Sequence, residues 1–156
     1  MKAATISELK QELTNCTPTQ ITELCLRLAR FKKENKELLT YLLFETHDTV
    51  TYIQSVKKEM DEQFAGINKS NAYFIKKTLR KIIRMINKYT RYSSLAAVEA
   101  ELLIYFCHQM KDMDIATSSN QVLSNIYQAQ LKRINKAIST MHEDLQYDYL
   151  REIKTL

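Results

Sequence analysis

The chain has 156 residues, of which 45% are apolar and 26% are charged, and its formal net charge is +5. This length and balance are typical of one folded domain and argue against a disordered or fibrous chain. Its single glycine and single proline, Gly66 and Pro18, argue against an all-β or α/β protein, because strand turns use both residue types freely. The odd number of cysteines, three, argues against a disulfide scaffold.

Apolar residues recur at helical spacing along most of the chain, and polar capping residues precede several of these runs. Three capping boxes mark predicted helix starts: Thr5 with Glu8, Thr17 with Gln20, and Thr140 with Glu143. Pro18 supports the second start, because proline costs nothing at the first helical position. In chain order, we predict helices over residues 6–15, 18–33, 36–46, 49–65, 69–91, 95–113, 119–139 and 142–154.

Helices joined by such short connections must pack mainly antiparallel to their neighbours. The sequence therefore predicts a single all-α domain over residues 1–156, with about seven or eight antiparallel helices. Two architectures stay open at this point. One is a compact bundle, and the other is a short degenerate α-solenoid of helical hairpins, of the HEAT or armadillo kind.

Three segments carry a likeness to other proteins: residues 24–45 (LCLRLARFKKENKELLTYLLFE), 87–93 (NKYTRYS) and 101–107 (ELLIYFC). They resemble a family of uncharacterised bacterial all-helical proteins. The resemblance implies an all-helical fold. It implies no activity and transfers no functional residue to this chain.

The positive charge is concentrated in the middle of the chain. No acidic residue occurs between Glu62 and Glu99, and this stretch contributes +8, whereas the parts before and after it contribute −1 and −2. On a helical wheel with 100° per residue, the cations of the predicted helix 69–91 fall on the half opposite its apolar stripe. We call these residues the basic face: Lys76, Lys77, Arg80, Lys81, Arg84, Lys88 and Arg91.

The basic face has three interpretations. In the first, it is a solvated surface or is neutralised inside the protein, for instance by Glu99, Glu101, Asp144, Asp148 or Glu152. In the second, it binds a nucleic acid. In the third, it binds an acidic protein. Exposed helices usually mix charge signs, and like charges four residues apart cost a few tenths of a kcal/mol each. The sequence therefore favours a non-catalytic helical interaction module that binds an acidic partner or a polyanion.

An enzyme is the alternative class, with a pocket between helices built from groups such as His108, Glu101 and Tyr105. The sequence predicts no catalytic set, no metal site and no cofactor, because the histidines lack metal-ligand spacing and a single glycine precludes a phosphate-binding loop. The chain begins without a secretory hydrophobic region, and its longest apolar clusters are far below the roughly 20 residues of a membrane span. We predict a cytoplasmic protein without a membrane span. The oligomeric state stays open.

Overall fold

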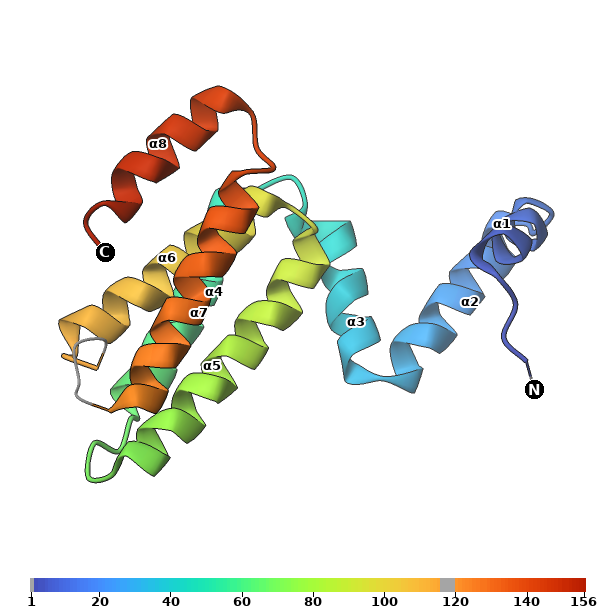
Figure 1. The fold of residues 1–156 in the computed structure, drawn as a ribbon. Coiled ribbons are helices and arrows are strands. Elements are labelled where there is room, and N and C mark those ends of the chain that lie inside the picture. The colour runs from blue at the N-terminus through green and yellow to red at the C-terminus, as the bar shows by residue number, and fades with distance from the viewer. Residues whose placement is uncertain (1, 116–119) are drawn as a thin grey trace. The chain divides into compact units, whose positions relative to one another are not determined.

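A computed structural model describes residues 2–115 and 120–156, and the chain divides into two compact units, residues 1–44 and 45–156 (Figure 1). The described residues form eight α-helices and one π-helical turn, and none of them lies in a β-strand. The predicted all-α fold class is confirmed. That the whole chain acts as a single domain stays a prediction.

The first unit contains α1 (Ile6–Thr14), α2 (Pro18–Phe31) and α3 (Lys33–Thr40). Both predicted capping boxes at its helix starts are present: the side chains of Thr5 and Thr17 each accept a bond from the backbone three residues on. The chain is extended at Lys32, with φ −142° and ψ 143°, so α2 ends two residues earlier than predicted and α3 starts at once. The π-helical turn, η1 (Tyr41–Glu45), follows α3 directly.

None of the described residues in α1, α2 or α3 is buried. In residues 2–44 only Tyr41, in η1, is buried. The apolar stripe of α2 is therefore not a core, although its helical spacing resembles that of a core helix. Isolated helices of 8 to 14 residues are marginal in water, so the stability of this unit must come from packing of these faces.

The second unit contains five helices: α4 (Thr49–Ala65), α5 (Ala72–Ser93), α6 (Ala96–Asp112), α7 (Gln121–Ile138) and α8 (Glu143–Ile153). Helix α6 packs most extensively against α7 and also contacts α4 and α5, while α8 contacts α7 (Figure 1). Within this unit α4 to α7 therefore form a bundle around α6.

Helix α6 is apolar on most of its circumference, which is typical of a helix at the centre of a core. Eight of its residues are buried, among them Leu102, Leu103, Ile104 and Phe106. The Phe106 ring lies 5.6 Å from the ring of Phe64 on α4, centroid to centroid. The apolar cluster at residues 102–107 thus forms the middle of the second unit.

Helix α5 begins after Asn71, whose side-chain oxygen accepts a hydrogen bond from the backbone N–H of Tyr73. It ends at Ser94, which takes the left-handed conformation (φ 55°) that commonly terminates helices. The predicted apolar stripe holds the helix against the bundle: Leu79, Ile82 and Ile86 are fully buried, and the flanking isoleucines of the stripe are half-buried. Most residues on the opposite side of α5 are exposed.

The third predicted capping box is wrong. The side chain of Thr140 donates to the carbonyl oxygen of Ala137 and so stays bound to the end of α7, and α8 is capped by His142 instead. Residue 119, the predicted start of α7, lies outside the described residues, and Asn120 caps this helix with bonds from the backbone of residues 122 and 123.

Candidate functional site

The seven residues of the basic face all lie on α5, on the side away from its buried stripe. Five of them are exposed and two, Lys76 and Lys88, are half-buried. The Lys88 ammonium lies 4.5 Å above the ring of Tyr89, and the Lys76 ammonium lies 5.7 Å from the ring centre of Tyr73. The rise of α5 spreads the seven charges over about 22 Å along one helix.

The central cations of the basic face form no ion pair with a carboxylate of the described residues. In the described part of the chain, Lys77, Arg80, Lys81 and Arg84 take part in no ion pair. Arg91 makes a local contact, because its Nε donates to the carbonyl oxygen of Asn87 at 3.3 Å. The repulsion between these like charges is therefore not offset by a neighbouring acid of the described residues.

Of the five carboxylates predicted as possible internal partners, three bind elsewhere and two make no ion pair with a described cation. Glu99 accepts a bond from Arg133 of α7 at 2.7 Å, and Glu101 accepts one from Lys57 of α4 at 2.7 Å. Asp144, on α8, lies 3.4 Å from the ring nitrogen Nδ1 of His142. The other two carboxylates, Asp148 and Glu152, are exposed and make no ion pair with any described cation.

An exposed aromatic residue extends the basic face at its N-terminal end. Tyr73 lies four residues before Lys77 and seven before Arg80, so at 100° per residue it falls in the middle of the basic face. Its ring is more than half exposed and makes an edge contact with Phe74, with the ring centres 5.5 Å apart. Tyr73 is not one of the seven residues that the sequence predicts for the basic face.

The three groups of the alternative enzyme site lie on one side of α6, at positions 101, 105 and 108, and the polar atoms of Glu101 and Tyr105 are engaged in bonds between helices. Glu101 is paired with Lys57, and Tyr105 donates a hydrogen bond to Asp61 Oδ1 at 2.5 Å. Lys57 also lies 5.2 Å from the centre of the Tyr105 ring. His108 is half-buried beside them.

Glu101, Lys57, Tyr105 and Asp61 form a polar cluster between α4 and α6. The acid–base properties of this cluster suit a structural role. Burial and the hydrogen bond to Asp61 raise the pKa of Tyr105 to about 12. Burial, with the nearby charge of Glu101, also raises the pKa of Tyr149 on α8. Both phenols therefore stay protonated at neutral pH, where they act as hydrogen-bond donors rather than as general bases. The cluster connects α4 with α6 through groups 44 residues apart in the sequence.

Neither a reactive cysteine nor a metal centre is found among the described residues of the second unit. Cys107 is buried in α6, and burial raises its pKa to about 12, so its thiol is a packing group rather than a nucleophile. No three described His, Cys, Asp or Glu side chains gather in a way that could hold a metal ion. No helix in the described ranges combines the length and apolar composition needed to cross a membrane.

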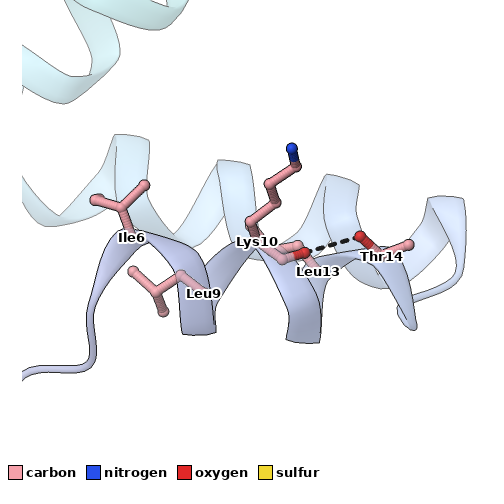
Figure 2. Close-up of a pocket in the computed structure, with 5 residues that line it drawn as sticks. All are labelled: Ile6, Leu9, Lys10, Leu13 and Thr14. Atoms are coloured by element: carbon pink, nitrogen blue, oxygen red, sulfur yellow. Dashed lines mark hydrogen bonds between the residues drawn. The ribbon is translucent and has the colours of Figure 1, made fainter.

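The first unit has a shallow depression along α1, lined by Ile6, Leu9, Lys10, Leu13 and Thr14 (Figure 2). Its lining is mostly apolar. The hydrogen bond drawn there joins the Thr14 hydroxyl to the carbonyl oxygen of Lys10, at 2.8 Å, and is internal to the helix. The depression therefore offers apolar surface and no acid–base pair.

Comparison with known proteins yields no match: no family model, no curated protein and no solved structure is similar to this chain. The resemblance to bacterial all-helical proteins, and to HEAT or armadillo repeats, stays a prediction. The basic face of α5, with Tyr73 at its end, is thus the candidate site that the described residues support best.

Proposed function

We propose that this protein is a non-catalytic helical interaction module that binds a polyanion through the basic face of α5. One observation carries the proposal. Four adjacent cations at the centre of the face, Lys77, Arg80, Lys81 and Arg84, are exposed and have no ion-pair partner among the described residues. A cytoplasmic location, as predicted from the sequence, belongs to this proposal.

Electrostatics supplies the driving force for such binding. A row of like charges on one helix lowers the stability of the free protein, and an anionic ligand removes this cost. A nucleic acid also releases condensed counterions when cations neutralise its phosphates, which makes binding strong at low salt. Seven cations over about 22 Å are sufficient to contact several successive phosphates.

Tyr73 favours a single-stranded nucleic acid over an acidic protein surface. Aromatic side chains beside a cationic groove stack on unpaired bases, and each such stack is worth about 1–3 kcal/mol by alanine substitution. An acidic protein surface offers no unpaired base for this ring to stack on. The expected ligand is therefore a single-stranded RNA or DNA, bound with little sequence preference.

The test is fluorescence anisotropy with a labelled single-stranded oligonucleotide of about 20 nucleotides, whose length exceeds that of the basic face. We expect the affinity to fall steeply with salt. The double variant Arg80→Glu/Arg84→Glu should bind much more weakly and reduce the slope of log K against log salt by at least about 1.4, since each phosphate contact contributes about 0.7. The matched control is Lys132→Glu/Lys136→Glu, two exposed cations four residues apart on α7.

An equal loss of affinity in the control pair would mean that only net charge matters, and unchanged binding in the α5 pair would refute the proposal.

Tyr73→Ala tests the nucleic acid specifically, with Tyr147→Ala as the control because Tyr147 is also exposed. We expect Tyr73→Ala to weaken oligonucleotide binding about 5- to 150-fold and to leave binding of a polyglutamate probe unchanged. Equal effects on both probes would contradict the stacking role.

A further inference from the structure

The first unit exposes the apolar faces of both its longer helices. In α2 the exposed side chains include Ile21, Leu24, Leu28 and Phe31, and the Phe31 residue is 78% exposed. In α1 they are the three apolar residues that line the depression of Figure 2. A segment of this size cannot be stable without burying such surface, and small units usually achieve this by association.

The apolar residues of α2 are arranged symmetrically along the helix. Their spacing is three, four and three residues, so the pattern reads the same in both directions around Leu26. At 100° per residue, all four lie within an arc of about 80° on one side of the helix. A helix that is symmetric about its own midpoint is complementary to a second copy of itself related by a two-fold axis.

We propose that α2 pairs antiparallel with α2 of a second copy of this chain, with the two-fold axis passing close to Leu26. In this pairing Ile21 of one copy meets Phe31 of the other, and Leu24 meets Leu28. The spacing is that of the a and d positions of a heptad, which allows side chains of one helix to enter the gaps of the other. The contact does not involve the basic face.

The helix dipoles favour the antiparallel direction. A parallel pair of α2 helices would align the two dipoles, whereas an antiparallel pair opposes them. The antiparallel pair also brings the two copies of Arg27 near each other across the two-fold axis. Salt screens the remaining repulsion, so association should strengthen slightly, or stay unchanged, as salt is added.

The amount of apolar surface is adequate for a modest dimer. Scaling the apolar area of each side chain by its exposed fraction gives on the order of 300–550 Å² for the seven side chains of α1 and α2 together. A standard interface buries about 800 Å² on each partner, of which a little over half is apolar. Together the faces of α1 and α2 carry an apolar area comparable to that of one such interface.

Sedimentation velocity of the full chain tests the association, and the helix offers a matched pair of substitutions. Leu24 and Leu26 are 43% and 44% exposed, but they lie on opposite sides of α2. We expect the native chain and Leu26→Glu to form a dimer with rising concentration, and Leu24→Glu to remain monomeric with unchanged circular dichroism. A native chain that stays monomeric up to about 500 µM, or an equal effect of both substitutions, would overturn the proposal.

Thiol crosslinking tests the direction of the pair. In the antiparallel arrangement the two copies of Cys25 lie about 3 Å apart along the axis, whereas the two copies of Cys16 are separated by roughly 30 Å. Cys107 is buried and does not interfere. A short bis-maleimide should therefore link two chains of the Cys16→Ser variant and fail to link those of Cys25→Ser. Equal linkage through either cysteine would overturn the antiparallel pairing.

Salt separates this inference from the polyanion proposal. Oligonucleotide binding must weaken as salt rises, whereas self-association through α2 must not. Leu24→Glu monomers should keep the affinity and the salt slope for a short oligonucleotide, and Arg80→Glu/Arg84→Glu should still dimerise. Self-association that disappears in the Arg80→Glu/Arg84→Glu variant, or that weakens in high salt, would refute the pairing without affecting the polyanion proposal.

Discussion

Replacing Arg84 by glutamate should stabilise the protein while weakening polyanion binding. Arg84 has Arg80 and Lys88 four residues away on the same helix and Lys81 three residues away, and it makes no ion pair among the described residues. Like charges at these spacings cost about 0.2–0.5 kcal/mol per pair, and opposite charges gain a similar amount. Reversing the sign at position 84 therefore adds about 1–3 kcal/mol to the free energy of unfolding at low salt.

Thermal unfolding followed by circular dichroism at low salt measures this effect. The expected gain corresponds to a rise in Tm on the order of 5 °C. Arg84→Gln is the matched control, because it removes the repulsion without adding attraction and should give about half the gain. Both gains should shrink at about 1 M salt, where charges more than about 3 Å apart are screened. A Tm that falls, or that does not respond to salt, would refute the view that these cations lack an internal partner.

Three further predictions concern the core and the polar cluster of the second unit. Phe106→Ala should lower the free energy of unfolding by about 3–5 kcal/mol in urea titrations, because it removes a fully buried ring; a loss below about 1 kcal/mol would contradict its place in the core. In the native chain a thiol reagent at pH 8 should modify Cys16 and Cys25 but leave Cys107 unmodified until the chain is unfolded, since burial raises the pKa of Cys107 to about 12. Tyr105 has a pKa of about 12 when folded, above the unfolded value of about 10, so its contribution to stability is complete below pH 10 and is lost as the pH rises to 12. Tyr105→Phe should flatten the alkaline fall of Tm, and an unchanged fall would exclude this cause.

The positions of most helices follow from local physics and were predictable. The capping boxes at Thr5 and Thr17 depend on atoms three residues apart, so the sequence contains everything needed to recognise them. Thr140 presents an equivalent pattern, but its hydroxyl bonds the last turn of α7, a competing partner that the pattern alone does not reveal. The predicted end of α2 lies two residues too late, because no glycine or proline marks the break at Lys32.

The composition of the basic face was also predictable, since periodicity alone places these cations opposite Leu79, Ile82 and Ile86. Whether an acid from another helix covers the face was not predictable. Glu99 was a reasonable candidate partner, yet its carboxylate lies 2.7 Å from Arg133, a residue 34 positions away. Ion pairing of this kind depends on how helices meet, which a helical wheel does not contain.

Helices α2 and α5 show most clearly which properties the sequence determines and which depend on the tertiary structure. Each carries an apolar stripe at helical spacing, and the sequence by itself determined that both are amphipathic helices with a defined polar side. Only the tertiary structure decided that Ile82 is fully buried while Leu28 is largely exposed. The physical reason is that helix formation and the direction of a side chain are set by neighbours within four residues, whereas burial and charge pairing require surfaces supplied by distant parts of the chain or by another molecule.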